Sequence, residues 1–93
     1  MNIDFEWDEE KNAKNIRKHG VSFEMAKKVF LDPRRFEMID IEHSIFEERL
    51  MTVGFSGLKL LSVIFTERDD SVRIITARKA DKHEEEEYFY GYR

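Results

Sequence analysis

The stretch from residue 49 to residue 79 constrains the fold most, because it holds three apolar segments separated by short turn signals. The segments are RLMTVGF, LKLLSVIFTE and SVRIITARK, and all three are rich in the β-branched and aromatic residues that strands favour. Ser56-Gly57 and Asp69-Asp70 lie between them, and such pairs are typical of tight turns. The pattern predicts two consecutive β-hairpins, which together form an antiparallel meander.

Two-residue loops fix which residues lie opposite each other in such a meander. The expected register places Ile64 opposite both Arg49 and Ile75. One face of the sheet would then be apolar enough to seat helices, and it would carry Met51, Val53, Phe55, Leu60, Ile64, Ile75 and Ala77. A bulge near Gly54 would exchange the two faces on one strand.

The N-terminal part of the chain predicts a short strand and then a helix. Apolar and acidic residues alternate in NIDFEW, as they do in a half-buried strand. Asp8 is placed to cap a helix that ends at Gly20, with Arg17, Lys18 and His19 in its last turn. Because the last carbonyls of a helix carry partial negative charge, this cationic run is explained as a helix end without any catalytic role.

A second helix is expected from Ser22, which can cap it, to about Leu31, and Asp32-Pro33 ends it. RRFEMI is a plausible strand and DIEHSIFE a polar loop. After the meander, the run EEEE followed by YFYGYR suits a final helix with Tyr88 and Phe89 turned inward. The predicted fold class is therefore α+β, with a small antiparallel meander sheet packed against two N-terminal helices and a C-terminal helix.

Composition predicts one globular domain over residues 1–93, since 41% of the residues are hydrophobic and 39% are charged. No cysteine is present, so neither a disulfide framework nor a thiolate nucleophile is available. No apolar run approaches the length of a membrane span or a signal sequence, and a cytoplasmic protein with no membrane association is expected. The net charge of −4 speaks against nonspecific nucleic-acid binding by the whole surface.

Arg78 is the residue whose placement most needs a function, because it ends a segment in which Ile74 and Thr76 predict a core-facing strand. A guanidinium there costs desolvation free energy unless an anion accompanies it. From the residues alone, an ion pair with Glu48 or Glu67 is at least as well supported as a bound phosphate.

A metal site is the less favoured interpretation of the acidic loop around His43. Asp40, Glu42 and Glu47 are the other possible ligands, but a loop rich in acids beside one histidine is more often solvated. We therefore expect no metal and no other cofactor.

Three long stretches resemble the BrnT toxins of bacterial type II toxin–antitoxin systems: FEWDEEKNAKNIRKHGVSFEMAKKVFLD, DIEHSIFEERL and TERDDSVRIITARKA. The resemblance covers nearly the whole chain. It implies a RelE-like fold and a metal-independent ribonuclease that blocks translation. It also implies a partner antitoxin with a ribbon-helix-helix DNA-binding part, so that operator DNA is contacted only indirectly. Thr76 stands where serine is frequent in the family, and the C-terminal helix is more acidic than the arginine-rich version, so it could instead meet a basic antitoxin surface.

Cleavage of RNA without a metal needs a base for the 2′-hydroxyl, cations for the phosphate and an acid for the leaving oxygen. With the resemblance, the predicted catalytic residues are Lys18, His19, Glu48, Arg49 and Arg78, and the predicted substrate-binding residues are Arg68, Arg73 and Tyr88. His43 is a reserve acid or base. For Tyr88, the more common alternative is a packed aromatic side chain. For Arg68, the more common alternative is a solvated surface role.

A noncatalytic module, either an RNA-binding regulator or a protein-interaction domain, is the alternative function. The acidic net charge and the absence of a dense basic stripe favour it.

Overall fold

The computed structural model describes residues 3–91, which form one five-stranded sheet and three helices. In their order across the sheet, the strands are β1 (Asp4–Glu6), β5 (Ser71–Lys79), β4 (Lys59–Arg68), β3 (Leu50–Ser56) and β2 (Phe36–Ile39). β1 runs parallel to β5, and the other neighbouring pairs are antiparallel. This confirms the predicted α+β class and the meander.

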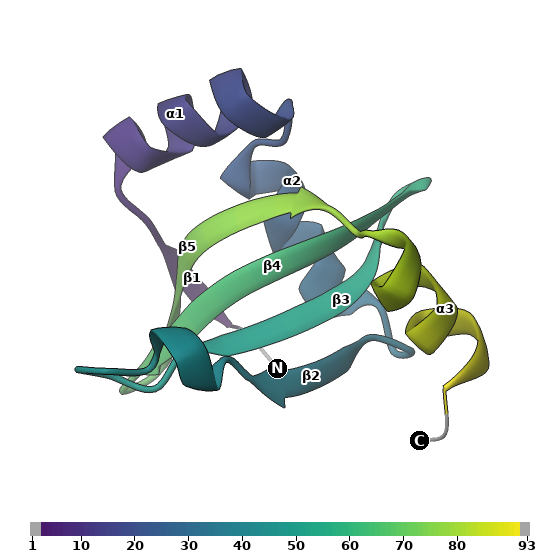
Figure 1. The fold of residues 1–93 in the computed structure, drawn as a ribbon. Coiled ribbons are helices and arrows are strands. Elements are labelled where there is room, and N and C mark those ends of the chain that lie inside the picture. The colour runs from purple at the N-terminus through teal and green to yellow at the C-terminus, as the bar shows by residue number, and fades with distance from the viewer. Residues whose placement is uncertain (1–2, 92–93) are drawn as a thin grey trace.

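In sequence order, two helices lie between β1 and β2, and one follows β5. They are α1 (Glu9–His19), α2 (Phe23–Lys27) and α3 (Lys82–Tyr90), with 3-10 turns η1 (Lys28–Leu31) and η2 (Ile41–His43) between them. In Figure 1, α2 lies behind the sheet, α1 runs along the side of β5, and α3 stands beside the right-hand end of the sheet. Among residues 3–91, no helix has the length and apolar character needed to cross a membrane.

Both ends of the first predicted helix and the start of the second are confirmed, because they depend on local hydrogen bonds. The Asp8 carboxylate accepts from the backbone N–H groups of Glu10 and Lys11, and Gly20 adopts a left-handed φ of 70° at the other end of α1. Ser22 caps α2, but the helix predicted to reach Leu31 is shorter, since its last turn is the 3-10 turn η1.

The predicted register of the first hairpin is wrong by two residues. The tight turn contains Gly57, with a left-handed φ of 62°, so that Ser56 pairs with Lys59. As a result Ile64 lies opposite Met51.

The second hairpin contains a bulge that reverses the faces of β5. Phe65 pairs with Ile74, and Ile64 pairs with Thr76, which leaves Ile75 as the extra residue. Ala77 consequently shares a face with Ile74. From the sequence, a bulge was considered near Gly54, whereas the bulge in the structure lies at Ile75.

The helices α1 and α2 cover the face opposite to the one expected. The buried core consists of Val21, Phe23, Ala26, Val29, Leu61, Val63, Phe65, Val72, Ile74 and Ala77. Most of the strand residues in this core are therefore ones that the predicted register had placed on the opposite face of the sheet. Thr76 and Arg78 face the opposite side, because the bulge separates them from Ile74.

A buried asparagine joins α1 to β5. The side-chain amide of Asn15 donates to the carbonyl oxygens of Val21 and Ala77, at 2.8 and 2.7 Å, and its oxygen accepts from Ala77 N–H and the Thr76 hydroxyl, both at 3.1 Å. All of these groups would cost free energy if they were buried without partners. The position of α1 along β5 is thus fixed by three hydrogen bonds, and the fourth ties Asn15 to Val21 in the loop that follows α1.

Asp32 anchors α3 to the sheet. The buried Tyr88 donates its hydroxyl hydrogen to Asp32 Oδ2 at 2.6 Å, and the same oxygen accepts from Phe55 N–H at 2.8 Å. Burial by itself would raise the pKa of Asp32, but hydrogen bonds from Phe55, Tyr88 and Arg34 outweigh it and lower the pKa. Phe89, which was also expected to turn inward, is 51% exposed.

Candidate functional site

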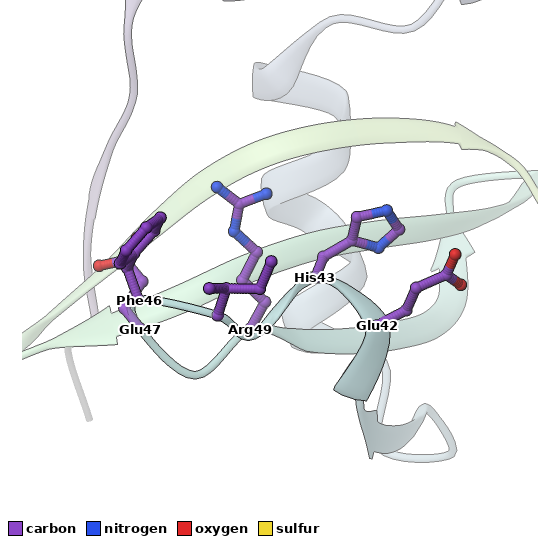
Figure 2. Close-up of a pocket in the computed structure, with 6 residues that line it drawn as sticks. Glu42, His43, Phe46, Glu47 and Arg49 are labelled. Carbon is purple, nitrogen blue, oxygen red and sulfur yellow. The ribbon is translucent and has the colours of Figure 1, made fainter.

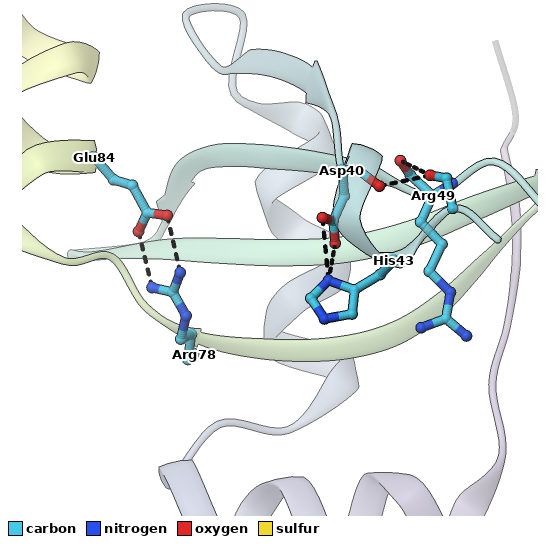
Figure 3. Close-up of polar contacts among 6 residues, drawn as sticks. Asp40, His43, Arg49, Arg78 and Glu84 are labelled. Carbon is cyan, nitrogen blue, oxygen red and sulfur yellow. Dashed lines mark hydrogen bonds and ion pairs between the residues drawn. The ribbon is translucent and has the colours of Figure 1, made fainter.

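The sheet face that α1 and α2 leave uncovered holds charged side chains at both of its ends. In Figure 3, Arg78 and Glu84 lie at one end, and His43 and Arg49 lie at the other, with α2 behind the sheet. α3 flanks the first end and the η2 segment flanks the second (Figure 1).

A pocket of about 320 Å³ lies at the η2 end of this face. Figure 2 shows it, and its lining residues are Glu42, His43, Ile45, Phe46, Glu47 and Arg49. All of them come from the segment between β2 and β3, which leaves one sheet edge, makes the turn η2 and returns to the sheet at Leu50. The segment therefore holds an imidazole and a guanidinium beside the same hollow.

The imidazole of His43 is oriented by Asp40. Its Nδ1 lies 3.0 Å from Asp40 Oδ2 and 3.1 Å from Oδ1. Because a carboxylate only accepts hydrogen bonds, the contact is satisfied by the tautomer with its hydrogen on Nδ1, and in that tautomer Nε2 is a proton acceptor. The His43 side chain is 60% exposed, so Nε2 is accessible to a substrate.

Arg49 is held by its backbone and unpaired at its side chain. Its N–H donates to Ser44 Oγ at 2.9 Å, and its carbonyl oxygen accepts from Asp40 N–H at 2.8 Å. Within the described part of the chain, its guanidinium makes no hydrogen bond or ion pair, although Nε is buried. No group of residues 3–91 occupies the two terminal nitrogens of the same guanidinium, so they can donate to an anion.

Arg78 is fully engaged by a protein carboxylate. Its two terminal nitrogens donate to the two oxygens of Glu84, each at 2.9 Å. The Glu84 side chain is only 9% exposed, and these hydrogen bonds raise the pKa of Arg78. The sequence offered an ion pair as one explanation of Arg78, but its partner is Glu84 of α3 and neither Glu48 nor Glu67.

The other predicted sheet cations also have protein partners. Arg73 lies 3.8 Å from Glu6, and Arg68 lies 3.4 Å from Glu47. Arg68 is exposed, as in the alternative given for it from the sequence.

Glu48 and Tyr88 lie outside the pocket. The carboxylate of Glu48 is exposed, and its backbone carbonyl accepts from the Thr66 hydroxyl at 2.8 Å. The ring of Tyr88 is buried against Phe55, which matches the packed-aromatic alternative and leaves it no open face for stacking on a base.

Lys18 and His19 lie in a different hollow. Together with Lys11, Lys14, Asn15, Ile75 and Thr76 they line a shallow groove of about 190 Å³ between α1 and β5. None of these residues lines the pocket of Arg49. The structure therefore does not bring all of the predicted catalytic residues together.

Residues 3–91 contain no group of three or more histidine, cysteine, aspartate or glutamate side chains arranged to hold a metal ion. Asp40 and His43, which were considered as ligands, instead contact each other. From the sequence alone, Asp40 and His43 were not predicted to act as a pair. The signal that could have identified them is their spacing of three residues, which a single helical turn converts into contact.

Comparison with known proteins gave one family match. The family described as "Ribonuclease toxin, BrnT, of type II toxin-antitoxin system" matches residues 7–84. No curated protein matches the chain.

Proposed function

The chain belongs to the BrnT family of ribonuclease toxins of type II toxin–antitoxin systems, and we propose that it cleaves RNA in the pocket of His43 and Arg49. A ribonuclease toxin of this type has RNA as its substrate and a cognate antitoxin as its partner. The proposal concerns which residues do the chemistry and how.

One observation carries the assignment of the site. The guanidinium of Arg49 makes no hydrogen bond or ion pair among residues 3–91, and it lies beside an imidazole that Asp40 orients. A guanidinium can donate to two phosphate oxygens at once, and it stabilises the charge that gathers on phosphorus oxygens in the transition state. By contrast, Arg78 would have to break its paired contact with Glu84 before it could bind a phosphate.

In the proposed reaction, Nε2 of His43 takes the proton of the ribose 2′-hydroxyl. The 2′-oxygen then attacks the adjacent phosphorus, the bond to the 5′-oxygen breaks, and Arg49 balances the negative charge. Water reaching the open pocket protonates the 5′-oxygen, and the hydroxide that remains takes the proton from His43, which restores the neutral imidazole. The products carry a 2′,3′-cyclic phosphate and a 5′-hydroxyl, and no metal ion takes part.

The remaining predicted catalytic residues take other roles in this proposal. Glu48, the alternative base expected from the sequence, lies outside the pocket and takes no part in this reaction. Arg78 holds α3 against the sheet through Glu84. Lys18 and His19 contact RNA away from the scissile bond.

We further propose that cleavage blocks translation and that the antitoxin carries a ribbon-helix-helix part. Support comes from the family match and from the net charge of −4, which disfavours direct binding of this chain to operator DNA.

The test is incubation of the purified protein with messenger RNA in excess chelator, with and without antitoxin. Cleavage in chelator that disappears in the His43→Ala variant and persists in His83→Ala supports the proposal. His83 is the matched control because it is an exposed histidine on α3. Intact RNA with a measurable gel shift would instead indicate a noncatalytic module, and cleavage that chelator stops would indicate a metal nuclease.

A further inference from the structure

Three lysines of α1 form a row on one side of the helix. Lys11, Lys14 and Lys18 are spaced by three and four residues, and all three line the groove between α1 and β5. At 1.5 Å per residue, the row is about 10 Å long. We call this groove, with His19 at its end, the lysine groove.

The charges of the lysine groove are not neutralised within the protein. Among the described residues, none of the three lysines lies within ion-pair distance of a carboxylate, whereas Arg35, Arg68, Arg73 and Arg78 are all paired. Glu9 and Glu10, in the first turn of α1, form no ion pair with these lysines within residues 3–91, and the Asp8 carboxylate caps the helix. In a chain of net charge −4, this row is a local concentration of unpaired positive charge.

The groove is rigidly placed next to the uncovered sheet face. Asn15 ties α1 to Thr76 and Ala77 of β5, and Ile75 and Thr76 form the floor of the groove. Thr76 pairs with Ile64 of β4. β5 is separated from β3 by two interstrand steps of about 4.8 Å each, and Arg49 immediately precedes β3. Figure 1 shows α1 running along this side of the sheet.

We propose that the lysine groove binds the phosphates of a single-stranded RNA segment next to the one that is cleaved at Arg49. The inference rests on the proposed function for the location of the cleaved bond. A groove of about 190 Å³ is suited to one backbone, and single-stranded RNA is flexible enough to bend from the pocket across β4 and β5 to α1. Lys18 and His19 then act in binding, which explains why they lie apart from the pocket.

The test compares two triple variants that change the net charge equally. One is Lys11→Gln, Lys14→Gln and Lys18→Gln, and the control is Lys28→Gln, Lys59→Gln and Lys82→Gln, three exposed lysines outside the groove. Fluorescence anisotropy measures binding of a long single-stranded RNA, made uncleavable by 2′-deoxy substitution, at several salt concentrations. If each lysine contacts one phosphate, the slope of log K against log salt should fall by about 2 in the groove variant, and by much less in the control.

Cleavage of a dinucleotide provides the second measurement. The groove variant should cleave it at the unmodified rate while cleaving long RNA more slowly. An equal loss on both substrates would place the lysines at the reacting phosphate and overturn the proposal. An unchanged affinity and salt slope would also overturn it, including the case in which only antitoxin binding weakens. If the unmodified protein cleaves no RNA but the slope falls as expected, the proposed function fails and the groove assignment stands as an RNA-binding site.

Discussion

The two ends of the uncovered sheet face present the same side chain in opposite states. At the α3 end, Arg78 donates two hydrogen bonds to a carboxylate that is 9% exposed. At the η2 end, Arg49 has no partner among the described residues and lies beside His43 (Figure 3). One arginine is satisfied by the fold, and the other is left with unused donors.

This difference separates a structural role from a functional one. Breaking a pair in which one ion is buried leaves an uncompensated charge, so Arg78 should contribute mainly to stability. An unpaired guanidinium contributes little to stability and retains its full capacity for an anion. Substitution of Arg78 should therefore change stability, whereas substitution of Arg49 should change cleavage.

The largest expected effect is on catalysis at the η2 end. Arg49→Ala should lower the cleavage rate by about 10²–10³-fold, as removal of a donor to developing charge does in other enzymes. The melting temperature should change little, since no protein group loses a partner. Arg17→Ala is the control, because Arg17 is exposed on α1 and lines neither hollow. A cleavage rate within a few fold of the unmodified protein would remove Arg49 from the site.

Arg78→Ala should instead act on stability. We expect the free energy of unfolding to fall by about 2 kcal/mol, less than for a fully buried pair because the Arg78 side chain is 40% exposed. Chemical denaturation measures this. The sequence analysis had placed Arg78 among the catalytic residues, whose loss would affect cleavage. A double variant that also carries Glu84→Ala should be less destabilised than the sum of the single changes. Strict additivity would show that the pair is energetically silent.

A smaller effect is expected where α3 is anchored. Tyr88→Phe removes the hydrogen bond to Asp32 and should cost about 1 kcal/mol, measured in the same denaturation experiment. Cleavage at the η2 end should be retained, since Tyr88 lies at the other end of the face. A loss of cleavage in a stably folded Tyr88→Phe protein would contradict the division between the two ends.

The smallest effect concerns pH. The pKa of Asp32 is lowered in the folded state, so its stabilisation is present above the unfolded carboxyl value of about 3.9 and is lost as pH falls through the folded value. Asp32→Asn should therefore be less stable than the unmodified protein at neutral pH, and the difference should shrink in acid. Denaturation midpoints at a series of pH values check this, and a difference that stays constant into acid would show that the ionised carboxylate is not responsible.

Much of the fold could be predicted because its signals are short-range. Asp8, Gly20 and Ser22 act on backbone groups within a few residues, and the structure confirms each of them. The faces of β5 could not be predicted, since one extra residue at Ile75 exchanges them beyond that point, and the sequence around it does not reveal a bulge.

The candidate site was predicted less well than the fold. The resemblance identified the family, and Arg49 was among the predicted residues, but Asp40 and His43 received little weight and Lys18 and His19 lie in another hollow. Charged residue types recur along this chain, and a residue's type does not tell which carboxylate lies within reach of it.

The sequence by itself determined the helix ends, the strand segments and the family, because each depends on neighbours along the chain or on the order of motifs. Only the tertiary structure decided which arginine is neutralised. Glu84 reaches Arg78 because α3 packs back onto the sheet, while the segment after η2 leaves the guanidinium of Arg49 without an ion pair among the described residues. Electrostatic interactions weaken steeply with distance and exposure, so three-dimensional packing settles which charges remain available to a substrate.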